Sequence, residues 1–313
     1  MTAPEILPVD EIAIQRAATL IRAGRCVAVP TETVYGLAAD ATSGEAVARI
    51  YATKGRPAFN PLIVHVGSIA QAAELAVFPH VAERLAEAFW PGPLTMVLPA
   101  RPASPIAALA TAGLATIAIR LPAHSAMRAL IAASGRPLAA PSANASGRIS
   151  AATAAHVAAS LGDRVPLILD GGPTQHGIES TIVAIDRDQL RLLRPGPIDA
   201  AALTAATGLP VVEMAASAIE APGQMSSHYA TSKLLRLEAR ARRDSEWLIG
   251  FGDVRGDDTL SASGDLVEAA ARLFETLHRA DAMSVRGIAV APVPKIGLGL
   301  AINDRLRRAA APR

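Results

Sequence analysis

The chain has 313 residues, and its 30 lysines and arginines against 28 aspartates and glutamates give a formal net charge of +2. This balance argues against a histone-like or arm-type nucleic-acid binder, because such proteins need a large basic excess. Hydrophobic residues make up 51% of the chain, but its 68 alanines inflate that fraction. A membrane-spanning helix is not expected, because no apolar run of about 18 residues lacks a charge or a proline.

The first ten residues and the cysteine content bear on localisation. Residues 1–10 contain acids and prolines and no basic stretch, which argues against a secretory signal. The single cysteine, Cys26, can form neither an internal disulfide nor a zinc site by itself. We therefore expect a soluble, cytoplasmic, globular protein.

Strand and helix patterns alternate along the first 208 residues. Strands are predicted at Cys26–Val29, Leu62–Val66, Leu94–Leu98, Thr116–Leu121, Leu138–Ala140, Leu167–Leu169, Thr181–Ile185 and Leu190–Leu193. Helices are predicted at Glu11–Ala23, Glu45–Thr53, His80–Phe89, Ser125–Ala133, Ala151–Leu161 and Asp199–Thr207. Interleaved strands and helices indicate an α/β domain, and the two consecutive strands at the end indicate an antiparallel part.

A change in composition divides the chain. Residues 213–232 lack a sustained apolar period and are rich in Ala, Ser, Pro and Gly, which is typical of a linker or a long ordered loop. Four further elements follow: a strand at Glu246–Gly250, a helix at Asp265–Ala280, a strand at Ile288–Ala291 and a helix at Leu298–Ala309. We expect a first domain over residues 1–208, a linker over 209–240 and a small C-terminal α/β domain over 241–313.

Several common functional motifs do not occur in the sequence. It has no GxxxxGK[ST], no GxGxxG after the first strand, no HExxH, no metal-spaced His/Cys cluster and no GxSxG. These observations argue against the usual phosphate loops, a zinc site and a serine hydrolase. No metal-ligating residue is predicted.

Polar segments follow several predicted strands. The segment Pro30–Leu37 places hydroxyls, a carboxylate and a glycine directly after an apolar strand. Ligands of α/β sheets collect at strand ends, so this segment is either a ligand-facing loop or an ordinary hydroxyl-rich turn.

Lys54 is the only lysine among the first 232 residues, and Arg56 follows it closely. An ammonium and a planar guanidinium together suit a polyphosphate. The alternative is that Lys54 interacts with the C-terminal dipole of the preceding helix.

Two later segments carry further candidate residues. Strand alternation places Thr116, Ala118 and Arg120 on one face, and a charge at the end of this apolar run needs a partner or an anionic ligand. The segment Pro141–Gly147, followed by Ser150, could form a backbone-lined cradle or a plain turn. Arg194 ends a strand, where a surface cation is the simplest interpretation.

Seven segments occur in the order PTETVYGL, KGRPAFNPLIVHV, FWPGPLT, IAIRLP, APSANASG, GGPTQHGIESTIV and LLRPG. Together they resemble the threonylcarbamoyl-AMP synthase family, whose catalytic part is the YrdC-like domain. The likeness spans residues 10–205, and the remainder resembles the longer, two-domain form, including the closing GLGLAINDRLRRAA. The resemblance implies a twisted, partly antiparallel mixed sheet with flanking helices, plus a small Rossmann-like α/β domain.

The resemblance also implies a reaction. L-threonine, bicarbonate or CO2, and ATP would give threonylcarbamoyl-adenylate and pyrophosphate. Downstream proteins would then transfer the threonylcarbamoyl group to the tRNA adenosine beside the anticodon; direct tRNA binding by this chain stays open. Such chemistry asks mainly for positioning and for neutralisation of phosphate charge, so a site with lysine and arginine but no nucleophile–base pair fits it.

By motif position, the resemblance implies a set of site residues. The L-threonine pocket would comprise Thr33, His65, Arg120, Ala140 and Ser180, with Arg120 pairing the carboxylate. The ATP pocket would comprise Lys54, Arg56, Asn60, Thr116, Ser142, Ser150, Arg194, His228 and Tyr229. Lys54 and Arg56 would be the catalytic residues, and Mg2+ would be held chiefly by the ATP phosphates, since no carboxylate cage is visible.

The linker departs from the family pattern, and other functions stay open. Longer members read PGMKYRHYAP, whereas Met225 and Ser227 replace two basic residues here. We expect the linker to close over the nucleotide and the C-terminal domain to modulate access. One alternative is an RNA-binding or ribosome-assembly factor, which the few aromatic stacking platforms disfavour. The other is a carbamoyl-adenylate-forming enzyme with a different acceptor.

Overall fold

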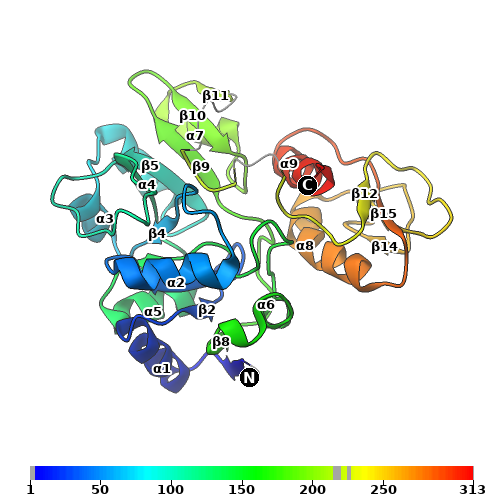
Figure 1. Cartoon of the computed structure of the whole chain (residues 1–313). Coiled ribbons are helices and arrows are strands. Elements are labelled where there is room, and N and C mark those ends of the chain that lie inside the picture. The colour runs from blue at the N-terminus through cyan, green and yellow to red at the C-terminus, as the bar shows by residue number, and fades with distance from the viewer. Residues whose placement is uncertain (1–3, 214–219, 224–226, 313) are drawn as a thin grey trace.

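The protein consists of two lobes, each built on its own sheet (Figure 1). The computed structural model describes residues 4–213, 220–223 and 227–312. An eleven-stranded mixed sheet forms the larger lobe, and a four-stranded parallel sheet forms the smaller, C-terminal lobe. The expected mixed, partly antiparallel α/β fold is thereby confirmed.

The large sheet has the strand order β1-β8-β2-β3-β7-β4-β6-β5-β9-β10-β11. Its strands are β1 (Glu5–Pro8), β2 (Val27–Val29), β3 (Gly36–Asp40), β4 (Ile63–His65), β5 (Leu94–Pro99), β6 (Thr116–Arg120), β7 (Leu138–Ala139), β8 (Leu167–Asp170), β9 (Thr181–Ile185), β10 (Leu190–Arg194) and β11 (Val211–Glu213). Its helices are α1 (Glu11–Arg22), α2 (Gly44–Lys54), α3 (Ile69–Leu75), α4 (His80–Phe89), α5 (Ser125–Ser134), α6 (Ala154–Leu161) and α7 (Ala200–Thr207), with a 3-10 turn at Gly162–Arg164.

The small sheet has the strand order β12-β15-β13-β14. Its elements are β12 (Leu234–Arg236), β13 (Glu246–Gly250), β14 (Asp258–Thr259), β15 (Gly287–Val290), α8 (Leu266–Ala282) and α9 (Leu298–Ala310). Within the described ranges, no helix has the length and apolar character that crossing a membrane requires.

The predicted elements are all present, and their ends differ from the structure by at most three residues. The largest difference is at α6, which starts late because the Thr153 side chain accepts a hydrogen bond from the His156 amide and caps the helix there. The strands β11 and β12 were not predicted and lie inside the expected linker. Residues 214–219 and 224–226 of that linker lie outside the described part, so the domain limits stay a prediction.

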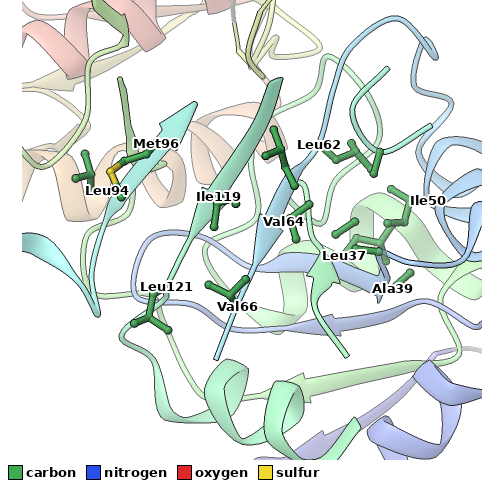
Figure 2. Close-up of a cluster of buried hydrophobic side chains, with 14 of the residues drawn as sticks. Leu37, Ala39, Ile50, Leu62, Val64, Val66, Leu94, Met96, Ile119 and Leu121 are labelled. Atoms are coloured by element: carbon green, nitrogen blue, oxygen red, sulfur yellow. The ribbon is translucent and has the colours of Figure 1, made fainter. Parts of the chain in front are cut away.

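The main hydrophobic core lies on one face of the large sheet. Figure 2 shows side chains of β4, β5 and β6 that share this face, among them Val64, Met96 and Ile119. Apolar residues of α2, α4, α6 and α7 pack against them. Because side chains alternate across a strand, the neighbouring residues Ile63 and His65 lie on the opposite face. That opposite face carries the site described below.

The C-terminal lobe packs against loops at this second face. A shared apolar cluster joins Ile178 of the larger lobe to Phe274 and its neighbours on α8. Gly177 has a φ of +67°, and a Cβ there would lie only 2.3 Å from the Ala271 carbonyl oxygen on α8. Only glycine allows so close an approach, so the two lobes meet at the loop that precedes β9.

Candidate active site

A pocket with about 530 Å3 of empty volume lies on the face of the large sheet opposite the main core. All five predicted L-threonine residues line it: Thr33, His65, Arg120, Ala140 and Ser180. From the predicted nucleotide set, the lining includes Arg56, Ser142, Arg194, His228 and Tyr229.

Strand register explains why these residues meet. His65 at the end of β4 pairs with Arg120 at the end of the parallel strand β6. On β10 the register shifts after Leu192, so that Arg194 pairs with Ile182 of β9. Such a bulge inserts one residue and redirects the next side chain. It places Arg194 on the pocket face, because residues paired across antiparallel strands share a face.

Arg120 has a carboxylate partner inside the pocket wall. Its Nη2 donates to Glu32 Oε1 at 2.6 Å and its Nη1 to Thr33 Oγ1 at 2.9 Å. Both members of the Arg120–Glu32 pair are almost fully buried. Burial alone would raise the pKa of Glu32, but the charge and hydrogen bond of Arg120 outweigh burial and lower it to about 2. Glu32 therefore fixes the direction in which Arg120 points.

His65 is held neutral beside this pair. Burial, and then the charge of Arg120, lower the pKa of His65 to about 3. Its Nδ1 has no hydrogen-bond partner within the described residues. The residue lines the pocket, and a buried polar atom without a partner is costly.

Arg56 and Arg194 differ from Arg120, because neither forms an ion pair with a carboxylate in the described ranges. Arg56 donates to the Asn60 and Pro61 carbonyls at 3.3 and 3.0 Å. Arg194 donates to the carbonyl and hydroxyl oxygens of Ser180, both at 3.0 Å. Burial lowers the pKa of each guanidinium to about 10. Two buried cations that form no direct ion pair suit an anionic ligand, although the charge of Glu179 also acts on Arg194.

Lys54 lies behind the pocket wall and does not line the pocket itself. It is the last residue of α2, and its Nζ donates to the carbonyl oxygens of Ser142, at 2.6 Å, and of Asn144. Burial, and then the charge of Arg56, hold the pKa of Lys54 well below its ordinary value. The side chain therefore organises the loop after β7, whose Ser142 reaches the pocket.

Besides Lys54, three predicted nucleotide residues lie outside the pocket lining. Asn60 contributes its backbone carbonyl to Arg56. Thr116 lies at the opposite end of β6 from Arg120, paired with Pro99. Ser150 is buried, and its hydroxyl donates to Glu179 at 2.5 Å. Their roles toward ATP stay predictions.

The described part of the expected linker contributes to the pocket lining. Pro222, Gly223, His228 and Tyr229 line the pocket. Tyr229 is fully buried at a φ of +64°, a strained conformation for a non-glycine residue that is enriched at functional sites. Its hydroxyl has no hydrogen-bond partner within the described ranges, and burial raises its pKa to about 12. Tyr229 therefore contributes a neutral hydroxyl to the pocket wall.

Sequence reasoning assigned no role to several residues that shape the site. Glu32 and Glu179 both belong to motifs quoted above, yet neither was a candidate. A buried carboxylate can be suspected only once its cationic partner is known, and Arg120 and Arg305 are distant in sequence. In the described residues, no group of three or more His, Cys, Asp or Glu could hold a metal ion.

Comparison with known proteins identifies the family. A family model described as "Telomere recombination" matches residues 19–196, and one described as "Threonylcarbamoyl-AMP synthase, C-terminal domain" matches residues 185–311. The threonylcarbamoyl-AMP synthase of Pyrococcus abyssi is 39% identical and covers 97% of this chain and 96% of its own. The Bacillus subtilis protein of the same name is also 39% identical, and the match covers 98% of this chain and 95% of that protein.

A solved structure agrees with these sequence relatives. The structure of P. abyssi Sua5 complexed with L-threonine has a TM-score of 0.89 and 38% identity, and it covers 97% of this chain and 96% of that one. Both lobes are therefore included in the likeness. The chain belongs to the threonylcarbamoyl-AMP synthase family, in its two-domain form.

Proposed function

We propose that this protein is an L-threonylcarbamoyladenylate synthase, a nucleotidyltransferase that converts L-threonine, CO2 or bicarbonate, and ATP into threonylcarbamoyl-AMP and pyrophosphate. The observation that carries the proposal is the charge of the pocket. Arg56 and Arg194 line it without carboxylate partners in the described ranges, and Lys54 lies directly behind. Full-length relatives of that name and a relative complexed with L-threonine support it.

The threonine end of the pocket is centred on Arg120. A guanidinium has five N–H groups, and the contacts to Glu32, Thr33 and the Gly92 carbonyl use three of them. The remaining two N–H groups, one on each terminal nitrogen, can pair with the carboxylate of L-threonine. We place His65, Ala140 and Ser180 around the rest of the amino acid; Ala140 can supply only its backbone and a methyl contact.

The phosphate end of the pocket is centred on Arg56 and Arg194. We assign these guanidiniums to the triphosphate, and Lys54 to stabilising the charge that develops as pyrophosphate leaves. A phosphate close to Lys54 would raise the pKa of this amine toward its ordinary value and keep it protonated. Ser142, His228 and Tyr229 supply polar contacts to the nucleotide. The outlying nucleotide residues remain part of the same proposal: Asn60, Thr116 and Ser150.

The proposed chemistry needs no protein nucleophile. The threonine amine adds to CO2 and loses a proton to give a carbamate. A carbamate oxygen then attacks the α-phosphorus, a new P–O bond forms, and the bond to the pyrophosphate leaving group breaks. The protein aligns the two substrates and supplies positive charge, which are the main sources of catalysis in phosphoryl and nucleotidyl transfer. Mg2+, held by the ATP phosphates, would supply additional charge neutralisation.

The cellular context follows from the product. Threonylcarbamoyl-AMP is a mixed anhydride that hydrolyses in water, so we propose that downstream proteins use it at once to modify tRNA adenosine. Such a role places the protein in the cytoplasm, with ATP, L-threonine and CO2 or bicarbonate as its small-molecule partners. We further propose that residues 1–208 form the catalytic domain and that the remainder modulates access to it.

Pyrophosphate release tests the proposal. Purified protein is incubated with ATP, Mg2+, bicarbonate and L-threonine, and the Lys54→Ala/Arg56→Ala double variant serves as the control. We expect release that depends on L-threonine and is lost in the double variant. Release from both proteins at equal rates would contradict the proposal. Release that depends equally on other amino acids would instead support an enzyme with a different acceptor.

A further inference from the structure

One arginine of the C-terminal lobe reaches into the wall of the pocket. Arg305, on α9, is fully buried, which is rare for arginine unless it is paired. Its Nε donates to Glu179 Oε2 at 2.9 Å, and its Nη1 donates to the Pro195 carbonyl at 2.8 Å. It also pairs with its neighbour Asp304 at 3.0 Å, and its guanidinium lies 5.6 Å from the centre of the Tyr229 ring. One side chain of the small lobe thus bridges two segments of the large lobe.

The two bridged segments hold the two sides of the proposed active site. Glu179 directly precedes Ser180, and Pro195 directly follows Arg194. Within the pocket, Arg194 donates to both oxygens of Ser180. The segments approach so closely that a Cβ on Gly196 would lie 2.4 Å from a backbone nitrogen of the facing segment. Arg305 therefore contacts the residue next to Ser180 on one segment and the residue next to Arg194 on the other.

We propose that Arg305 is a positioning residue of the synthase: it holds the Ser180 and Arg194 segments in register, so that the C-terminal lobe completes the active site without touching substrate. The kinetic part of this inference rests on the proposed function. The contacts of Arg305 with Glu179 and Pro195, called the Arg305 clamp below, form in the protein without ligands. They can therefore be measured without turnover.

Packing between the two lobes does not require the charge of Arg305. An apolar cluster with Ile178, Tyr229 and Phe274 already joins them, and the Tyr229 and Phe274 rings stack at 5.4 Å. Replacing a buried ion pair by apolar side chains of similar volume is often neutral or stabilising. A methionine or leucine in place of Arg305, opposite an apolar residue, would therefore join the lobes at least as well. The guanidinium of Arg305 donates to both segments at once, which indicates that its function is to set the distance between the Ser180 segment and the Arg194 segment.

Glu179 gives the Arg305 clamp a characteristic pH dependence. Burial raises the pKa of this carboxyl, but the charges of Arg305 and Arg194 and the bond from Ser150 outweigh burial, so its pKa is below the ordinary value. The other titratable groups that interact with its charge are Lys54, His228 and Tyr229, while Asp304 pairs with Arg305. Without Arg305, the pKa of Glu179 rises. Activity that depends on the ionised carboxylate is then lost as pH falls, and it returns as pH rises.

Three single variants test the proposal. R305M removes the charge at similar volume, R305K keeps the charge but cannot donate in a fork, and R307M is the control. Arg307 lies on the same helix, with a side chain that is 71% exposed. Hydrogen exchange of the unliganded proteins reports on residues 179–182 and 194–198. Steady-state pyrophosphate release reports kcat and the KM values for L-threonine and ATP across pH.

We expect R305M to speed exchange in both segments at least tenfold and to raise both KM values about tenfold, with the loss smaller at high pH. R305K should recover part of this loss, and R307M should match wild type. Unchanged exchange and unchanged KM values in R305M would overturn the proposal, as would a uniform loss of kcat that does not depend on pH.

If R305M does not fold, a variant that lacks the charges of both Glu179 and Arg305 provides the test. The double variant E179Q/R305M removes both members of the buried Glu179–Arg305 pair, so neither is left without the other, and we expect it to fold and still show raised KM values. Wild-type KM values in this protein would overturn the Arg305 clamp. If wild-type protein releases no pyrophosphate, the proposed function fails, while the exchange data still decide whether Arg305 holds the two segments together.

Discussion

Arg194→Met should separate stability from nucleotide binding. Arg194 is 5% exposed and has no carboxylate partner in the described ranges. Its pKa is lowered from 12.5 to about 10, which corresponds to about 3 kcal/mol spent on keeping the charge buried. Methionine removes this penalty and also removes two hydrogen bonds to Ser180, together worth about 3 kcal/mol. The two effects offset each other, so we expect the free energy of unfolding to change by less than about 1 kcal/mol.

The matched control is Arg120→Met. This change leaves Glu32 buried without its partner, and removing one member of a buried ion pair costs roughly 3–5 kcal/mol. Denaturant melts compare the two variants, and isothermal calorimetry measures ATP binding. Arg194→Met should weaken ATP binding about 10- to 100-fold, because a hydrogen bond to a charged group contributes about 1.5–3 kcal/mol. A loss of stability equal to that of Arg120→Met, or unchanged ATP binding, would contradict the role assigned to Arg194.

Three further predictions concern the pocket wall. Because Glu32 has a lowered pKa, its pair with Arg120 stabilises the protein above about pH 4.5. This contribution, about 3 kcal/mol, should be lost as pH falls toward 2. Melts of Glu32→Gln at acid pH should lack this pH-dependent loss. Since His65 has a pKa of about 3, L-threonine affinity measured by calorimetry should show no histidine titration between pH 5 and 8; a clear transition near pH 6.5 would argue against a neutral His65. Gly196→Ala would force a Cβ to 2.4 Å from backbone, so we expect a loss of about 1–3 kcal/mol of stability together with a higher KM for ATP; wild-type values of both would contradict the close approach.

The sequence predicted the elements that carry a strong local signal. Apolar strands such as β9 and amphipathic helices such as α4 have clear periods, and their ends agree with the structure. The strand β3 was missed because its sequence GLAAD has no β-branched or aromatic residue, and pairing with β2 and β7 on either side makes it a strand. The helix α3 was missed because it has only seven residues.

The charged residues of the pocket show where sequence reasoning stops. Alternation correctly indicated that Arg120 needs a partner or a ligand, but only the structure identifies Glu32 as that partner. The strand pattern alone indicates a surface cation at Arg194, whereas the family motif assigns this residue to the nucleotide; the structure shows a bulge in β10 that directs it into the pocket. No local pattern links Glu179 with Arg305, because their contact depends on how the two lobes dock. Ion pairs between distant segments are set by tertiary structure, which one sequence does not display.

The proposed reaction joins CO2, L-threonine and the adenylate of ATP in one product and releases pyrophosphate. Mass spectrometry of a reaction with 13C-labelled bicarbonate tests it most directly, since the label must enter the threonylcarbamoyl carbonyl. We predict a product with the mass of threonylcarbamoyl-AMP, raised by one unit in labelled bicarbonate and absent without L-threonine. AMP and pyrophosphate formed without this adduct, or an adduct that carries no label, would contradict the proposed reaction.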